Sequence, residues 1–151
     1  MQIRDDQQGM QAAVREAERA LAIDEVPVGC VIVHDGMIVG RGHNQVEQLK
    51  DATAHAEMIA IGAASEALGS WRLNQCTMYV TLEPCAMCAG AIVLSRLDRV
   101  VFGAFDDKAG MAGSVADILR HPKLNHRPQV QAGVLATETG ELLAGFFRSR
   151  R

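Results

Sequence analysis

Residues 77–104 read TMYVTLEPCAMCAGAIVLSRLDRVVFGA, and this stretch decides the fold class. Residues 77–82 are typical of a β-strand. Pro84 then takes the first position of a predicted helix that continues to about Ser95, and residues 99–104 predict a second strand. A strand, a helix of about a dozen residues and another strand form a βαβ unit, so we expect the two strands to be parallel.

The rest of the chain adds further elements on both sides of this unit. Apolar residues at helical spacing over residues 7–22 predict an amphipathic helix, which Asp24 and Pro27 end. Residues 28–34 and 37–40 are apolar runs joined by an Asp-Gly pair, the pattern of a β-hairpin. The remaining predicted elements are a polar loop at 44–51, a helix over 54–68 capped by Thr53, a short helix near 114–120, a strand near 129–135 and a final helix near 138–148.

These elements predict a three-layer α/β/α sandwich with a mixed sheet of about five strands. A chain of 151 residues can bury a hydrophobic core without disulfides, and we expect residues 1–151 to form a single domain. Hydrophobic residues make up 48% and charged residues 22%, which excludes a disordered chain. The net charge of −3 means that any binding of nucleic acid has to depend on a local basic patch. Candidates for this patch are Arg148, Arg150 and Arg151, with Arg120, Lys123 and Arg127 upstream.

The sequence also bears on the cellular compartment. The N-terminal residues contain no apolar stretch that resembles a secretory signal. The longest run of apolar residues and glycine, residues 86–94, is far too short to span a bilayer. We therefore expect a cytoplasmic protein with no membrane partner. In that reducing compartment four cysteines indicate metal binding, catalysis or burial, and not disulfides.

Cys85 and Cys88 stand at the start of the helix that follows Pro84. Positions i and i+3 share one face of a helix, so both sulfur atoms can bind one metal ion. The partial positive charge at a helix N-terminus favours the thiolate, which is the form that binds zinc. The spacing alone also fits a redox pair or two buried cysteines, so assignment to a metal needs a third ligand.

His55 supplies a third ligand, in the motif His55-Ala56-Glu57 at the start of another predicted helix. Zinc in catalytic sites has three protein ligands and keeps a fourth position open for water. A fourth cysteine ligand would make a closed structural site. Cys30 and Cys76 have no partner at ligand spacing, and we interpret them as small core residues.

Glu57 is the candidate catalytic residue. It lies two positions after His55, about 200° around a helix, so it is better placed to reach water at the metal than to be a second ligand. A carboxylate there can take a proton from water and pass it to a leaving group. Taken alone, Glu57 also fits a carboxylate that only stabilises a helix N-terminus. Beside three zinc ligands we interpret it as the proton carrier.

The full pattern, His-x-Glu followed by Pro-Cys-x-x-Cys, is the signature of the zinc nucleobase deaminases of the cytidine deaminase-like superfamily. Beyond it, the chain resembles the bacterial tRNA-specific adenosine deaminases over nearly its whole length. Several matching stretches lie outside the zinc site, so the resemblance extends to the family. These stretches are residues 24–29, 43–44, 53–57, 81–92, 102–104, 112–114, 125–127 and 146–148.

The resemblance implies hydrolytic deamination of adenosine to inosine at the wobble position of a tRNA anticodon loop, with one zinc ion per subunit. Water activated by zinc would replace the 6-amino group while Glu57 carries the proton. The resemblance also implies a homodimer that binds the anticodon stem-loop near the subunit boundary. The implied substrate contacts are Asn44, Ala56, Pro84, Asp106, Lys108 and Phe147.

Several implied contacts have a purely structural alternative. Asn44 could end a strand, the segment around Asp106 could be a solvated turn, and Phe147 could pack in the core. Two positions also depart from the family pattern. Ala52 stands where proline is common, and Phe105 stands where a polar or charged residue is common.

The helix predicted after Cys85 supports a dimer. Residues 86–94 are apolar on nearly all sides. A helix without a polar face has to be buried all round, which a small sandwich does not provide for a helix on its surface. Burial by a second subunit explains the pattern.

Two other functions fit parts of the sequence. One is a zinc deaminase of a free base or nucleoside such as cytosine, cytidine or guanine, which suits the acidic net charge. The other is a non-catalytic zinc-binding or RNA-binding subunit. The intact Glu57 argues against the second, because a structural zinc site needs no proton carrier.

Overall fold

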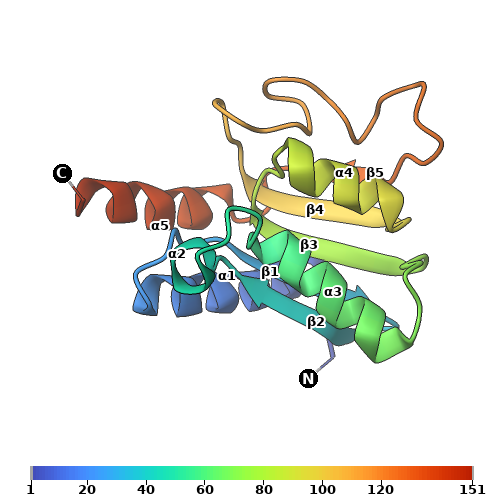
Figure 1. Ribbon diagram of the computed structural model, residues 1–151, viewed down its shortest axis with the longest axis horizontal. Helices are drawn as coiled ribbons and strands as arrows, with labels where there is room; N and C mark the ends of the chain where they lie inside the picture. The colour runs from blue at the N-terminus through green and yellow to red at the C-terminus, as the bar shows by residue number, and fades with distance from the viewer. Residues whose placement is uncertain (1, 151) are drawn as a thin grey trace.

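Five strands form one mixed sheet, and helices cover both of its faces (Figure 1). The computed structural model describes residues 2–150. The arrangement confirms the predicted three-layer α/β/α sandwich. In chain order the elements are α1 (Asp6–Ala22), β1 (Gly29–His34), β2 (Met37–His43), α2 (Val46–Leu49), α3 (Ala56–Leu68), β3 (Cys76–Leu82), α4 (Ala86–Leu94), β4 (Arg99–Ala104), β5 (Gln129–Gln131) and α5 (Ala136–Arg148).

The sheet has the strand order β2-β1-β3-β4-β5. β1 is antiparallel to β2 and β3, whereas β3, β4 and β5 are parallel. The parallel β3–β4 pair, joined through α4, confirms the predicted βαβ unit. The predicted hairpin is also present, and Asp35 and Gly36 at its turn both have positive φ, as the tight turn requires. α3 and α4 lie on the same face of the sheet and begin near the same edge (Figure 1).

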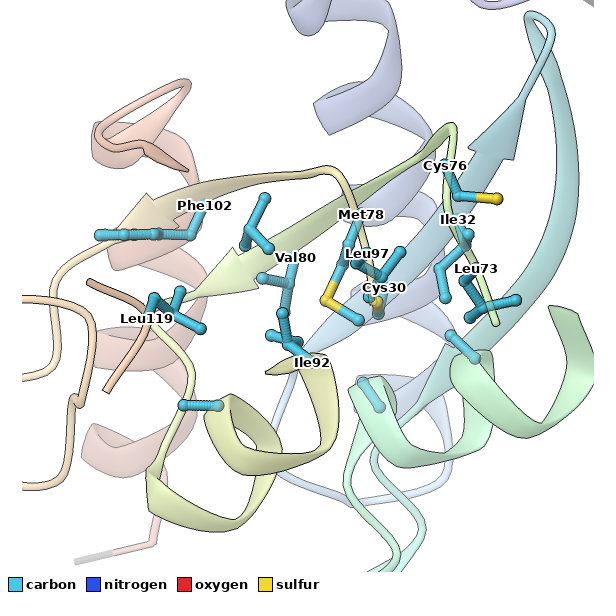
Figure 2. Packing of buried hydrophobic residues seen from close by; sticks show 14 of the residues in the cluster. Cys30, Ile32, Leu73, Cys76, Met78, Val80, Ile92, Leu97, Phe102 and Leu119 are labelled. Carbon is cyan, nitrogen blue, oxygen red and sulfur yellow. The ribbon is translucent and has the colours of Figure 1, made fainter. Parts of the chain in front are cut away.

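Alternate strand residues face two separate hydrophobic cores. One core includes Cys30, Ile32, Met78, Val80 and Phe102 from the strands, Ala60 from α3 and Ile92 from α4. Figure 2 shows Met78, Val80 and Ile92 close together in this core. The other core includes Val31, Val33, Tyr79 and Val101 from the strands, with Met10 and Ala13 from α1. Cys30 and Cys76 are both buried, which confirms that they are core residues.

Two glycines allow α3 to lie directly against β2. A Cβ atom added to Gly42 would lie 2.3 Å from the carbonyl oxygen of Ala56 and 2.8 Å from the nitrogen of Ala60. A Cβ atom on Gly40 would lie 2.4 Å from the carbonyl oxygen of Ala60. A side chain at either glycine would therefore push α3, and His55 just before it, away from the sheet.

Residues 114–120 do not form the predicted short helix. They form turns, and an isolated bridge links Ala112 to Asp117. Gly113 has a φ of 130°, which no helix accommodates. The chain here wraps around the buried carboxylate of Glu83 instead of coiling, because the N–H groups of Ala112 and Ser114 donate hydrogen bonds to it.

The start of α3 also differs from the prediction. Its N-cap residue is His55, and the hydroxyl of Thr53 donates to the carboxylate of Asp51 instead of capping the helix. The capping contact comes from Asn44, whose side-chain oxygen accepts the N–H of Ala56 at 2.9 Å. A contact between residues so far apart in the chain leaves no local sequence signal.

Three other boundaries differ from the predicted ones. Cys85 is the N-cap of α4, so Pro84 precedes the helix instead of opening it. The predicted polar loop contains the short helix α2. β5 ends at Gln131, and Gly133 then adopts a φ of 82° that turns the chain toward α5. Within residues 2–150, no helix combines the length and the apolar character that crossing a membrane requires.

An ion pair ties the start of α1 to the sheet. Both guanidinium nitrogens of Arg99 on β4 contact the carboxylate of Asp6, each at 2.6 Å. The hydroxyl of Tyr79 on β3 donates to the same carboxylate at 3.1 Å. The Arg99 hydrogen bonds lower the pKa of Asp6, although partial burial opposes them, and burial raises the pKa of Tyr79 to about 12. Asp6 is therefore ionised at neutral pH and holds three elements together.

We predict that Asp6→Asn lowers the free energy of unfolding by about 1–2 kcal/mol at pH 7, because a bidentate charged hydrogen bond is lost. The folded-state pKa of Asp6 is lowered, so its contribution is complete above the unfolded pKa of about 3.9. It is lost as the pH falls through the lower folded-state pKa. Urea unfolding of both proteins at pH 7 and at a pH below the unfolded pKa of Asp6 measures this difference.

The control for this prediction is Glu18→Gln, which removes an exposed carboxylate from the same helix. It should unfold like the parent chain at both pH values. An Asp6→Asn variant with parental stability at pH 7 would contradict the role assigned to the ion pair.

Candidate active site

The three predicted metal ligands come from the starts of two helices. His55 and Cys85 are the N-cap residues of α3 and α4, and Cys88 follows in the first turn of α4. His55 Nδ1 lies 3.6 Å from Cys85 Sγ and 3.5 Å from Cys88 Sγ. The three donor atoms all lie within 4.8 Å of one another. The structure therefore brings together the ligands that the sequence predicted.

The donor set fits one zinc ion. Zinc–sulfur bonds of about 2.3 Å and zinc–nitrogen bonds of about 2.1 Å at tetrahedral angles separate sulfur from nitrogen by about 3.6 Å. The observed sulfur–nitrogen distances match this spacing. Two thiolates and one imidazole are the soft ligands that zinc prefers, and three protein ligands leave one position for water or substrate.

The two thiols differ in how readily they lose their protons in the metal-free protein. Hydrogen bonds from the Cys88 thiol and from His55 lower the pKa of Cys85 to about 3. The hydrogen bond between His55 and Cys85 also raises the pKa of His55. The hydrogen bond between Cys88 and Cys85 raises the pKa of Cys88, because Cys88 is the proton donor of this bond in the metal-free protein. Both cysteines also lie at the positive end of α4, which favours thiolates.

Glu57 lies in the first turn of α3, and only 4% of its surface is exposed. Burial raises the pKa of Glu57 to about 7, and the negative charge of Cys85 adds to this effect. Both protonation states of the carboxyl group are thus accessible near neutral pH, which suits proton transfer. Glu57 lines a cavity of about 140 Å³ together with His55, Cys85 and Asn44.

Two wider cavities adjoin this small one. A cavity of about 840 Å³ shares Asn44 and His55 with it, and one of about 570 Å³ shares Leu82 and Asp106. Val26 lines all three cavities, whereas Phe147 lines only the two larger ones. The metal centre therefore lies where two open depressions meet.

The predicted substrate contacts fall into two groups. Asn44, Asp106, Lys108 and Phe147 line the cavities. Ala56 and Pro84 are buried and line neither the central cavity nor the two wider ones. Their backbone groups are already bonded, because the Ala56 N–H donates to Asn44 and the Pro84 carbonyl accepts from Met111.

The two phenylalanines near the C-terminus differ in their exposure to solvent. Phe146 is buried, and Phe147 is 51% exposed with its ring edge-on to Phe146. Phe105, which departs from the family pattern, is 57% exposed and lines the cavity of about 570 Å³. Aromatic side chains on a depression of this kind offer stacking surfaces for unpaired bases.

The basic patch expected from the sequence is only partly available. Arg150 pairs with Asp24 and lies over the ring of Phe146, 4.3 Å from its centroid. Arg120 pairs with Asp117, and Arg127 donates to backbone carbonyls. Arg151 lies outside the described residues. Among the residues that line the two larger cavities, Arg150 and Lys108 are the basic ones.

Sequence reasoning missed two buried glutamates beside the metal centre. Glu83 accepts hydrogen bonds from three backbone N–H groups and from the Ser114 hydroxyl. Burial alone would raise the pKa of Glu83, but these donors outweigh it and lower the pKa. Glu25 accepts the N–H groups of Glu47 and Gln48 at the start of α2. Both glutamates lie within stretches that match the family, but their partners are distant in sequence, so no local pattern indicated a role.

The family comparisons agree with this geometry. Residues 3–104 match the family described as the cytidine and deoxycytidylate deaminase zinc-binding region. A tRNA-specific adenosine deaminase from Bacillus subtilis is 49% identical over 146 residues, which cover 97% of this chain and 91% of the relative. One from Aquifex aeolicus is 50% identical over 142 residues, which cover 94% of this chain and 93% of the relative.

Solved structures give the same result. A structure from a study of A-to-I editing by tRNA:A34 deaminases superimposes with a TM-score of 0.86 at 44% identity, covering 89% of this chain and 98% of that one. A guanine deaminase from Nitrosomonas europaea has a TM-score of 0.79 at 21% identity, covering 97% and 86%, and shares the fold alone. The chain belongs to the family of tRNA-specific adenosine deaminases, within the zinc-binding cytidine and deoxycytidylate deaminases.

Proposed function

We propose that this chain converts adenosine to inosine at the wobble position of a tRNA anticodon loop, with Glu57 as the catalytic proton carrier. The observation that carries the proposal is the buried Glu57 beside the ligand set His55, Cys85 and Cys88. The substrate follows from relatives named tRNA-specific adenosine deaminase, which are about half identical over nearly the whole chain.

The reaction replaces the 6-amino group of adenine by oxygen from water. Zinc, when bound, supplies a Lewis acid that activates water at neutral pH. Glu57 takes a proton from the attacking water and delivers it to N1 of the base. It then carries a second proton from the new C6 hydroxyl to the 6-amino group, so that the C6–N bond breaks, ammonia leaves and C6 becomes a carbonyl carbon. Adenosine and water thus give inosine and ammonia, and Glu57 ends in its starting protonation state.

The size of the central cavity favours an unpaired base. A space of about 140 Å³ at the bottom of two depressions does not admit a base that is still stacked in a duplex. An anticodon loop presents bases that are already unpaired, so the cost of unstacking is small. We propose that Asn44 contacts the target nucleoside and that Asp106, Lys108 and Phe147 contact its neighbours. Ala56 and Pro84 could contribute only if substrate approaches their backbone.

We predict that Glu57→Gln lowers inosine formation on an anticodon stem-loop by about 10²-fold or more, because the proton carrier is lost. The variant should still bind one zinc ion, since the ligand set is unchanged. Inosine is measured by nucleoside chromatography, with the zinc content measured in the same sample. Glu66→Gln, which alters an exposed glutamate of the same helix, is the matched control and should keep full activity.

Parallel reactions with free adenosine, cytidine and guanine separate the alternatives. Turnover of a free base or nucleoside but not of the stem-loop would leave the zinc chemistry in place and refute the tRNA substrate. A zinc-loaded parent chain that turns over none of these compounds would support a non-catalytic subunit.

We further propose that the chain is a cytoplasmic homodimer. The outer side of α4 is apolar, as is the first half of α3, and Leu94 is 71% exposed in the single chain. Gly62 on α3 and Gly90 on α4 have no atom within 4 Å of an added Cβ, so they leave room for close approach of another helix. A second copy would cover this surface. The cytoplasm holds tRNA and keeps the cysteines reduced.

We predict that the double variant Gly90→Asp, Leu94→Glu has the mass of one chain in solution, 16.3 kDa, whereas the parent has twice this mass. Two carboxylates on the surface would have to be buried without partners in a dimer. Light scattering at micromolar concentration measures both masses. Met37→Glu, an exposed site on the β1–β2 hairpin, is the control and should remain dimeric. A monomeric parent chain would refute the dimer.

A further inference from the structure

Glu83 is a buried carboxylate that the proposed proton transfers do not use. It lies between the end of β3 and the ligand Cys85, and only 2% of its surface is exposed. Its Oε1 accepts the N–H of Asp106 at 3.0 Å, and its Oε2 accepts the N–H groups of Ala112 at 2.9 Å and Ser114 at 3.0 Å. The Ser114 hydroxyl also donates to Oε1. Four donors thus converge on one side chain.

All four donors belong to one segment, residues 105–114, which we name the rim loop. The rim loop contains no helix or named strand, and contacts outside itself contribute to its shape. Besides the bonds to Glu83, the N–H of Met111 donates to the carbonyl of Pro84 at 2.8 Å. The loop is therefore wrapped around residues 83–84, directly before the first cysteine ligand.

Gly110 shows how closely the rim loop fits the carboxylate. A Cβ atom added to Gly110 would lie 2.3 Å from Cδ of Glu83 and 2.4 and 2.5 Å from its two oxygens. No larger residue can occupy this position while Glu83 keeps its hydrogen bonds. The chain thus has glycine where the loop passes over the carboxylate.

The same loop supplies one side of the substrate cavity. Phe105, Asp106, Lys108 and Ala109 all line the cavity of about 570 Å³, and Asp106 and Ala109 also line the central one. Asp106 in turn holds the next residues of the loop, because its Oδ1 accepts the N–H groups of Lys108 and Ala109, each at 3.1 Å. A continuous series of hydrogen bonds therefore runs from Glu83 to the residues at the cavity wall.

We propose that Glu83 is a positioning residue of the deaminase site, which fixes the rim loop so that Asp106 and Lys108 meet the nucleotides beside the target base. The proposal rests on the proposed function for its substrate. Its physical basis is that the rim loop has no regular structure of its own and that its N–H groups converge on a single buried side chain. Glu83 also lines the central cavity, but in this role it acts through the rim loop and not on the reacting base or the metal.

The test is Glu83→Gln, which keeps the shape but replaces one acceptor oxygen by an NH₂ group that faces N–H donors. On the anticodon stem-loop we expect KM to rise about tenfold or more and kcat to stay within about threefold, because binding is lost more than chemistry. Amide exchange at Asp106, Ala112 and Ser114 should become about 30-fold faster, because their hydrogen bonds open locally. Zinc content should be unchanged, as should the absorption spectrum of the cobalt-substituted protein, which reports on the thiolate ligands.

Two further variants keep the test decisive if Glu83→Gln folds poorly. Gly110→Ala retains the carboxylate but displaces it, so it should raise KM and speed exchange in the same segment. Ser114→Ala removes one donor of four and should raise KM only about two- to threefold. Asp6→Asn, which lowers stability far from the rim loop, is the control for a general loss of stability and should leave KM unchanged.

Each other outcome counts against the proposal. Faster exchange in the rim loop with an unchanged KM would show that the loop does not position substrate. A fall in kcat with loss of zinc, or an altered cobalt spectrum, would place the role of Glu83 at the metal centre. If the parent chain forms no inosine, the proposed function fails, and the exchange rates still show whether Glu83 holds the loop.

Discussion

The starts of α3 and α4 face one another at one edge of the sheet, and the chemistry depends on this arrangement. Each helix N-terminus carries partial positive charge and unbonded N–H groups, which stabilise thiolates and carboxylates nearby. His55 and Cys85 are the N-cap residues, so the metal ligands occupy the positions where this field is strongest. Gly40 and Gly42 hold α3 at the necessary distance from the sheet. Small shifts of either helix would separate the ligands.

Charge and burial are unevenly distributed around this centre. Glu57, Glu83 and Glu25 are all buried, but their surroundings differ. Burial outweighs the hydrogen bonds to Glu57 and raises its pKa, whereas four hydrogen bonds outweigh burial at Glu83 and lower its pKa. One carboxyl group can therefore exchange a proton near neutral pH, and another beside it stays ionised and structural. Identical side chains acquire different uses from the balance between burial and hydrogen bonding.

The features that could be predicted from the sequence are those encoded within a few residues. The βαβ unit, the hairpin at Asp35-Gly36 and the spacing of Cys85 and Cys88 are local, and all were found. The short helix predicted at 114–120 was wrong, because its conformation depends on a carboxylate some 30 positions away, as the Ser114 contacts with Glu83 show. The cap of α3 by Asn44 was missed for the same reason. Contacts across the chain decide these positions, and no window of sequence contains them.

The placement of the ligands also sets an order on assembly. Cys85 and Cys88 approach one another as soon as the first turn of α4 forms, because they are three residues apart. His55 joins them only after β1, β2 and β3 have paired, since that pairing brings α3 beside α4. The βαβ unit by itself therefore supplies two ligands, and the complete sheet supplies three. Tight metal binding thus reports that the antiparallel half of the sheet has docked onto the parallel half.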